Sequence, residues 1–201
     1  MKIIGLCGGS GSGKGTVCEI FSKNQIPAID TDKVYRELTS ADSECLQALK
    51  KAFGNDIIAS DGALDRRKLA TIVFSGTNAA SQLEMLNKIS HKFILDETRK
   101  RLSGFEKNGY KAAIVDAPVL FESGFNEECD ILVAVLAKME TRVSRIIFRD
   151  GISAENAMQR INSQMSDEEL ISRCDYIIYN DLDLNALEKE VESCINKIFE
   201  K

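Results

Sequence analysis

A glycine-rich loop that ends in a lysine lies near the start of the chain, in the segment GLCGGSGSGKGT (residues 5–16). The loop has the GxxxxGK spacing, follows an apolar run and precedes a helical pattern. In such a strand–loop–helix unit, backbone N–H groups and the helix dipole point at phosphate oxygens, and the lysine reaches the terminal phosphates. The segment therefore predicts a site for nucleotide phosphates, made of Gly8, Gly9, Ser10, Gly11, Ser12, Gly13, Lys14, Gly15 and Thr16.

Continuous apolar runs alternate with helix-length amphipathic stretches, which is typical of parallel strands joined by crossover helices. We predict an α/β fold with a five-stranded parallel sheet flanked by helices. The expected strands are residues 2–7, 26–29, 111–116, 130–136 and 175–180, and the expected helices begin near Gly13, Asp65, Ala79, Met139, Ser153 and Asp183.

Two long segments interrupt this alternation. The gap between the second and third expected strands exceeds what a crossover requires and is mostly helical in pattern. A second helical stretch, broken at Gly151 and Ser153, separates the fourth strand from the fifth. We predict a nucleotide-binding core from residues 1–30, 111–138 and 171–201, a helical insertion at 31–110 and a further helical segment at 139–170.

The composition of the 201 residues, 44% apolar and 28% charged, is that of a folded chain. A net charge of −5 argues against a protein that coats nucleic acid, which needs a clustered basic surface. The chain has no signal-peptide pattern and no apolar run of about 18 residues, so we expect no membrane association and a cytoplasmic location. The six cysteines include no CxxC pair and are expected to stay reduced, with Cys7 buried in the first apolar run.

Candidate magnesium ligands lie at two places. Gly15 replaces the hydroxyl residue that usually joins the magnesium shell in such loops, and Thr16 follows one residue later. Mg²⁺ tolerates this loss because it keeps several waters and uses few protein ligands. The run KAAIVD ends in Asp116, where a carboxylate can hold magnesium or, alternatively, cap the next turn. We expect Mg-ATP, with Asp116 and Thr16 as candidate metal ligands.

Two carboxylates, Asp30 and Asp32, follow the second expected strand. In an extended segment they would face the same side, and ligands bind beyond the carboxyl ends of parallel strands. A carboxylate there could orient and deprotonate an acceptor hydroxyl as it attacks the γ-phosphate. The alternative is that one of them caps the helix that starts near Thr31. We predict that Asp32 is catalytic and that Asp30 is a cap or a support.

Arg142, Arg145 and Arg149 recur at helical spacing beside an apolar stripe, and Arg160 follows on the next helix. One face of such a helix can pack while the other reaches a phosphate site, where arginine stabilises the charge of a transferring phosphoryl group. The alternative is a solvated basic face that pairs with nearby acids. The spacing alone leaves both interpretations open.

His91 is the only histidine, which excludes histidine triads and histidine-rich metal sites. It lies in a long helical pattern, where packing or a surface position is the default. Arg66 and Arg67 follow the expected Asp65 cap and are either surface charges or anion-binding side chains.

Together these motifs resemble dephospho-CoA kinase along nearly the whole chain. The resemblance rests on the loop and on IDTD (29–32), VDAPVLFESG (115–124), RDG (149–151), RINSQ (160–164) and FGNDIIASDGALDRRKLATIVF (53–74). It implies a P-loop kinase core, a substrate-binding role for 31–110 and a lid at 139–170 that closes over ATP. The implied reaction transfers the γ-phosphoryl group of ATP to the ribose 3'-hydroxyl of dephospho-CoA, giving coenzyme A and ADP.

The resemblance also implies roles for individual residues. We expect the catalytic residues to be Asp32, Lys14, Arg145 and Arg149, and Asn180 to join the loop in binding ATP. The expected contacts to dephospho-CoA are Asp32, Arg66, His91 and Asp116, while Arg160 and Gln164 fall in the lid stretch. We expect a monomer or a weak homo-oligomer.

The chain departs from the family pattern at three positions. Gly15 rules out magnesium ligation by residue 15, Arg142 stands where glutamine is usual, and Lys92 stands where proline is common. A nucleoside monophosphate kinase of adenylate or cytidylate type is the main alternative, but adenylate-type enzymes usually carry DGFPR where this chain reads DAPVLFE. A P-loop nucleotide switch is less favoured, because it leaves the acidic pair and the long insertion unexplained.

Overall fold

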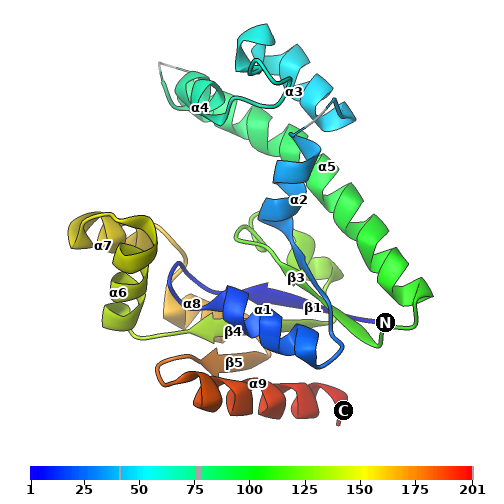
Figure 1. The fold of residues 1–201 in the computed structure, drawn as a ribbon, viewed down its shortest axis with the longest axis vertical. Helices are drawn as coiled ribbons and strands as arrows, with labels where there is room; N and C mark the ends of the chain where they lie inside the picture. Colours follow the sequence, from blue (N-terminus) through cyan, green and yellow to red (C-terminus); the bar gives the residue numbers. More distant parts are fainter. Residues whose placement is uncertain (41, 76–77, 201) are drawn as a thin grey trace. The chain divides into compact units, whose positions relative to one another are not determined.

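The computed structural model describes residues 1–40, 42–75 and 78–200, and it confirms the predicted α/β fold with five parallel strands. The sheet order is β2-β3-β1-β4-β5 (Figure 1). The strands are β1 (Lys2–Cys7), β2 (Ala28–Asp30), β3 (Ala112–Asp116), β4 (Ile131–Leu136) and β5 (Tyr176–Tyr179). The strand that leads into the glycine-rich loop is therefore the central one.

Several helices begin directly after a capping residue. The side chains of Asp65, Ser153 and Asp183 each accept a hydrogen bond from a backbone N–H of the first helical turn, as expected of N-caps. All six predicted starts are confirmed to within one residue. The helices are α1 (Lys14–Lys23), α2 (Thr31–Leu38), α3 (Glu44–Phe53), α4 (Arg66–Phe74), α5 (Ala79–Lys107), α6 (Met139–Asp150), α7 (Ala154–Asn162), α8 (Asp167–Arg173) and α9 (Leu184–Phe199), with 3-10 turns η1 (Asn55–Ile57) and η2 (Phe125–Glu128).

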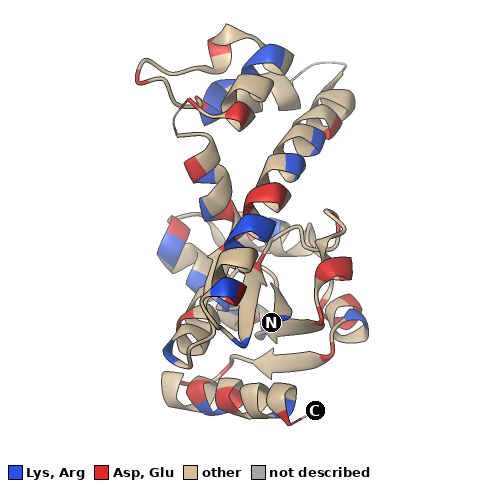
Figure 2. Cartoon of the chain, turned by 90° about the vertical axis from the view of Figure 1, so that its right-hand side faces the viewer, with Lys and Arg blue, Asp and Glu red and all other residues tan. Residues whose placement is uncertain are grey.

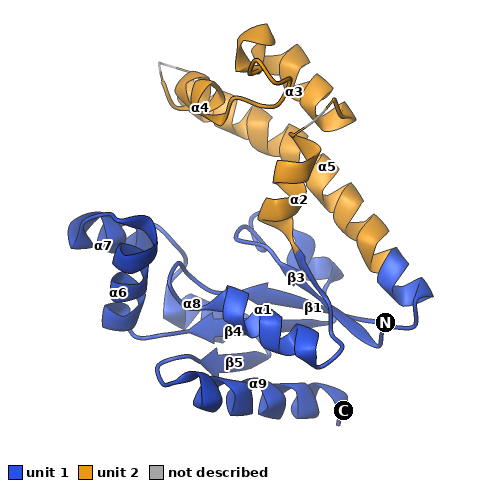
Figure 3. Ribbon diagram, in the orientation of Figure 1, with its two compact units in different colours: residues 1–29, 104–201 blue, residues 30–103 orange. Residues whose placement is uncertain are grey.

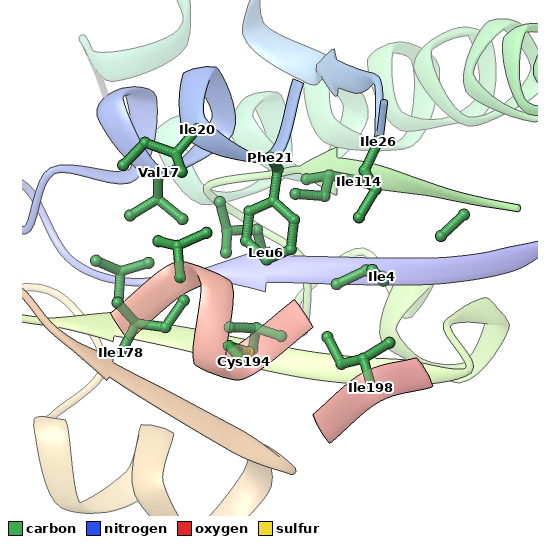
Figure 4. Packing of buried hydrophobic residues seen from close by; sticks show 14 of the residues in the cluster. Ile4, Leu6, Val17, Ile20, Phe21, Ile26, Ile114, Ile178, Cys194 and Ile198 are labelled. Atoms are coloured by element: carbon green, nitrogen blue, oxygen red, sulfur yellow. The ribbon is translucent and has the colours of Figure 1, made fainter. Parts of the chain in front are cut away.

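The main hydrophobic core lies between the sheet and the helices α1 and α9 (Figure 4). Alternate residues of β1, Ile4 and Leu6, point into it and are fully buried, as is Phe21 of α1. Burying a large apolar side chain of this kind stabilises the fold by about 1.5–3 kcal/mol. The packed core fixes the central strand, and with it the start of the loop.

The chain divides into two compact units (Figure 3). The first consists of residues 1–29 and 104–201, and the second of residues 30–103. The second unit has its own apolar cluster, in which Leu49, Ile57 and Val73 are fully buried. The segment 139–170 falls within the first unit, and its separate action as a lid stays a prediction.

Charged side chains are distributed over both units of the described chain. Acidic and basic residues are interspersed along the helices in the view of Figure 2, which agrees with the small net charge of −5. Among the described residues, no helix is both long enough and apolar enough to cross a membrane.

Candidate active site

The glycine-rich loop joins β1 to α1 with an unusual backbone. Its φ is +145° at Gly8 and +96° at Gly13, a region that L side chains rarely adopt. A Cβ atom at Gly8 would also lie 2.4 Å from the carbonyl oxygen of Val135. α1 begins at Lys14, so the unpaired N–H groups of its first turn lie at the end of the loop. The loop and the helix start can together surround an anion.

Arg145 and Asn180 hold the loop from outside. Arg145 Nη1 donates to the carbonyl oxygens of Gly11 at 3.2 Å and of Ser12 at 3.4 Å. The buried Asn180 donates from Nδ2 to Ser12 O at 2.8 Å, and its two oxygens accept from Arg145 Nη2 at 3.1 and 3.3 Å. Because N–H and C=O point in opposite directions across a trans peptide, the N–H of Gly13 points away from these donors.

The ammonium group of Lys14 lies over the loop. Its Nζ donates to Gly8 O at 2.8 Å and lies 4.0 Å from Asp116 Oδ1. Asp116 reaches this place because β3 pairs with β1 in the register Leu6↔Asp116. Both charged side chains are 17% exposed, so their interaction is less screened than in open water. The loop lysine and the carboxylate at the end of β3 are therefore neighbours, and both face the loop.

The oxygen donors beside the loop fit magnesium. Asp116 supplies a carboxylate and Thr16 a hydroxyl, and Mg²⁺ combines one or two protein oxygens with phosphate oxygens and water. Gly15 is exposed, and nothing lies within 4 Å of the place that its Cβ would occupy. In the part of the chain that the structure describes, no group of three or more acidic, cysteine or histidine side chains could hold a metal by itself. A magnesium ion at this place would need the phosphate oxygens of a nucleotide.

The arginines of α6 and α7 have different surroundings. Whereas Arg145 contacts the loop, Arg149 is exposed and donates to both oxygens of Asp150, at 2.7 and 2.9 Å. Arg160 also donates to Asp150, at 2.5 Å. The hydrogen bond from Arg149, together with that from Arg160, lowers the pKa of Asp150 to about 2. The two outer arginines thus share one acidic partner on the protein surface.

Asp30 caps α2, as predicted. It ends β2 in an extended conformation, and its side chain accepts a hydrogen bond from the N–H of Lys33 at 3.0 Å. The expectation that Asp30 and Asp32 share an extended segment is wrong, because the cap starts the helix at Thr31 and Asp32 lies in the first helical turn. Two-residue spacing places side chains on one side of a strand but on different sides of a helix. Asp32 is exposed and belongs to the second unit, and its catalytic role stays a prediction.

Arg66 and His91, which are also predicted to bind the acceptor substrate, belong to the second unit as well, whereas Asp116 belongs to the first. Arg66 is exposed at the start of α4, and its Nη2 donates to Thr39 Oγ1 at 3.0 Å. His91 is half-buried in α5. Their contacts with a substrate stay predictions.

Arg142 contacts the loop, whereas the sequence alone left open whether it reaches the phosphate site or lies on a solvated face. Its side chain is almost fully buried, Nε donates to Ser10 O at 3.0 Å, and Nη1 lies 3.2 Å from Asp167 Oδ1. Gln164 accepts a hydrogen bond from the N–H of Ser10 at 2.8 Å. Asp167 was not predicted, because no local spacing relates position 167 to position 142.

Two thiols meet where β1 enters the loop. The Sγ atoms of Cys7 and Cys174 lie 3.2 Å apart, and Cys7 is buried as predicted. The hydrogen bond from Cys7 lowers the pKa of Cys174, while that bond and burial raise the pKa of Cys7. All six cysteines are described, and none is in a disulfide.

A cavity of about 270 Å³ adjoins the loop within the first unit. Its walls are Gly8 and Gly9 of the loop, the segment 118–122 after β3, and the segment 163–165 before α8. The stretches VDAPVLFESG and RINSQ therefore contribute to one hollow beside the phosphate loop.

Comparisons with known proteins agree on one family. The sequence profile described as dephospho-CoA kinase matches residues 2–186. A curated dephospho-CoA kinase from Corynebacterium glutamicum is 36% identical over 198 residues, which cover 98% of this chain and 100% of that protein. Another from Bacillus cereus is 34% identical over 195 residues, which cover 97% of this chain and 96% of that protein.

Solved structures show the same relationship. The protein TT1252 from Thermus thermophilus has a TM-score of 0.81 and 29% identity, with 98% of this chain and 97% of that chain covered. A dephospho-CoA kinase from Campylobacter jejuni has a TM-score of 0.71 and 25% identity, with 100% and 98% covered. A shikimate kinase from Acinetobacter baumannii, at 14% identity, 100% and 94% coverage and a TM-score of 0.55, is similar in fold alone.

Proposed function

We infer from the match over nearly the whole chain that this protein, which belongs to the dephospho-CoA kinase family, transfers the γ-phosphoryl group of ATP to dephospho-CoA. The acceptor is an alcohol group, the ribose 3'-hydroxyl, and the products are coenzyme A and ADP. One observation of the structure carries this inference: a lysine, a strand-end carboxylate and the start of a helix meet at a glycine loop on the central strand. The comparisons do not favour a nucleoside monophosphate kinase.

ATP binds with its phosphates in the loop Gly8 to Thr16. The outward hydrogen bonds of Arg145 and Asn180 support this assignment, because they orient the loop peptides before a ligand arrives. Lys14 exchanges its contact with Gly8 O for a phosphate oxygen, and Asn180 lies near the adenine. Such a preformed loop stabilises the developing charge with little rearrangement.

Magnesium accompanies ATP and is held by Asp116 and Thr16 together with phosphate oxygens. When bound, it neutralises charge on the phosphates during transfer. Because Gly15 offers no hydroxyl, this chain depends more on Asp116 than a chain with serine at that position. The ammonium group of Lys14 lies 4.0 Å from Asp116 Oδ1, so both charged side chains are close to the proposed metal site.

The residues proposed to contact the acceptor are those that the family resemblance implies. Asp32 orients the acceptor hydroxyl and takes its proton as the oxygen attacks phosphorus. Asp116, Arg66 and His91 contact the rest of dephospho-CoA. Family resemblance and side-chain chemistry support these roles. Asp32 is an exposed carboxylate, Arg66 is an exposed guanidinium, and His91 is the only imidazole of the chain.

Arg145 and Arg149 stabilise the charge of the transferring group, and the segment 139–170 excludes water as a lid. The support for the arginine roles is the family resemblance, and in the structure Arg145 contacts the loop from its outer side. Arg149 is held by Asp150 and leaves this partner when it engages phosphate. We further propose a cytoplasmic protein that acts as a monomer or a weak homo-oligomer.

The reaction is tested by measuring ADP release with dephospho-CoA, AMP, CMP and adenosine as separate acceptors. We expect ADP and coenzyme A in equal amounts with dephospho-CoA, and only background ADP with the other three. Turnover with AMP at a comparable rate would contradict the proposed acceptor.

The role of Asp32 is tested by Asp32→Ala. Loss of a general base slows transfer by about a hundredfold or more, while the affinity for ATP stays near that of the wild type. Asp56→Ala removes another exposed carboxylate of the second unit and serves as the control. Equal turnover by Asp32→Ala and wild type would refute the assignment.

A further inference from the structure

The guanidinium of Arg142 is buried against the phosphate loop with one nitrogen left without a partner. The residue is 4% exposed. Its Nε and Nη1 have partners, but Nη2 is buried and finds no hydrogen-bond acceptor among the described residues. A buried donor that is left unpaired costs about 1–3 kcal/mol, and more when it is charged. Such a cost calls for a functional explanation.

Arg142 packs directly on the loop backbone. If Gly9 had a Cβ atom, that atom would lie 2.0 Å from Nη2, so the guanidinium occupies the space that a side chain at Gly9 would need. The bond from Nε to Ser10 O holds that carbonyl toward Arg142. Because N–H and C=O of a trans peptide point in opposite directions, the N–H of Gly11 is turned away from Arg142.

The charge of Arg142 is only partly balanced. Asp167, its acidic partner, is 39% exposed and bonds Nη1 alone. Water screens an exposed carboxylate more than a buried guanidinium, so net positive charge remains behind Gly9 and Ser10. An apolar or amide side chain of similar length would fill this place without that charge.

We propose that Arg142 is a positioning residue for the nucleotide phosphates: it fixes the peptide between Ser10 and Gly11 with its N–H turned toward the phosphate site, and it supplies positive charge from behind the loop. Asp167 acts through Arg142, because its contact with Nη1 holds the guanidinium where Nε can donate to Ser10 O. The inference rests on the proposed function only in taking ATP as the ligand of the loop.

The test compares Arg142→Gln with Arg142→Lys. Glutamine can keep a hydrogen bond to Ser10 O but removes the charge, whereas lysine keeps the charge without the planar fork. We expect Arg142→Gln to weaken equilibrium ATP binding about tenfold and Arg142→Lys to recover part of that loss. The KM for dephospho-CoA should stay unchanged. Lys189→Gln removes an exposed charge of α9 in the same unit and is the control.

The salt dependence of ATP binding distinguishes the effect of the positive charge of Arg142 from the effect of its packing. We expect the affinity of wild type for ATP to fall more steeply with salt than that of Arg142→Gln, because the variant has lost a positive charge at the anion site. Equal ATP affinity in wild type and Arg142→Gln would overturn the proposal, as would a loss with an unchanged salt slope. ATP binding is measured without dephospho-CoA, so failure of the wild type to phosphorylate dephospho-CoA would count against the proposed function alone.

The role of Asp167 is tested by a double-mutant cycle. Asp167→Asn should change ATP affinity in the wild type and leave it unchanged in the R142Q background, because its effect passes through Arg142. Glu168→Gln, at the next and exposed position of α8, is the matched control. Equal effects of Asp167→Asn in both backgrounds would overturn the role of Asp167.

Discussion

Gly9 and Gly15 belong to the same loop but have very different surroundings. A Cβ atom at Gly9 would collide with the guanidinium of Arg142, whereas nothing lies within 4 Å of the place that a Cβ at Gly15 would occupy. Gly15 lies in the first turn of α1, where alanine is a better helix former than glycine. Space and backbone conformation, rather than membership of the motif, decide which glycine the loop needs.

We therefore predict opposite effects of two alanine substitutions. Gly9→Ala should displace Arg142, lower the free energy of unfolding by about 1–3 kcal/mol and weaken ATP binding. Gly15→Ala should keep ATP binding and raise the free energy of unfolding by up to about 1 kcal/mol. Urea unfolding and equilibrium ATP titration of both variants check this. Normal ATP affinity in Gly9→Ala would contradict the packing described for Arg142.

The contact between Cys7 and Cys174 predicts how the alkylation rate of Cys174 depends on pH. The hydrogen bond with Cys7 favours the thiolate of Cys174, so Cys7→Ala should raise the pKa of Cys174. At neutral pH a smaller thiolate fraction then makes alkylation of Cys174 slower. The measurement is the rate of iodoacetamide labelling of the Cys174 peptide against pH. Cys194→Ala, at a buried thiol of α9, is the control, and an unchanged profile in Cys7→Ala would contradict the assignment.

Some contacts of single residues could be predicted from the sequence, and others could not. The cap at Asp30 was predictable because Asp is a preferred N-cap residue and stands here between a strand pattern and a helical pattern. The same cap turns the chain into a helix before Asp32, so the extended pair was not correct. The contact of Arg142 with Asp167 depends on how α6 and α8 pack, and no pattern within either helix encodes it.

Elements were more predictable than contacts. Apolar runs located all five strands, and capping residues located the starts of α4, α7 and α9, because both signals are local. The sheet order was not expected in advance, since it depends on pairing between segments far apart in the sequence. The loop contacts of Asn180 follow from that order, because β5 ends near the loop only after β4 has paired with β1.

Arg160 of α7 contacts Asp150 at the end of α6 and so joins the two helices, while Arg149 of α6 binds the same carboxylate. The pKa of Asp150 in the folded chain, about 2, is below the ordinary value of about 3.9. Its contribution to stability is therefore present above pH 4 and is lost as the pH falls toward 2. We predict that the urea midpoints of wild type and Asp150→Asn differ at pH 7 and that this difference shrinks as the pH falls from 4 to 2. Glu155→Gln should show no such convergence, and a pH-independent difference for Asp150→Asn would contradict the ion pairs.

At the scale of the whole molecule, each compact unit has a core of its own. Leu49 is fully buried in the cluster of the second unit, and Leu6 is fully buried in that of the first. A chain with two cores need not unfold in one step, so local stability is best measured unit by unit.

We predict that Leu49→Ala lowers the stability of residues 30–103 by about 2–5 kcal/mol. Hydrogen exchange should accelerate in α3 and α4, and ATP binding by the first unit should change little. Leu6→Ala is the matched comparison and should accelerate exchange in β1 and β3 instead. Equal acceleration of both units by Leu49→Ala would show that the two cores unfold together.

The position of β1 in the sheet has a consequence for the newly made chain. Its two neighbours, β3 and β4, are translated only after the whole of residues 30–103. At about 5–20 residues per second, a ribosome needs roughly 4–16 s to pass from β2 to β3. The strand that leads into the glycine loop thus waits through this interval for both of its neighbours, and a chaperone that shields apolar nascent segments can act on it during that time.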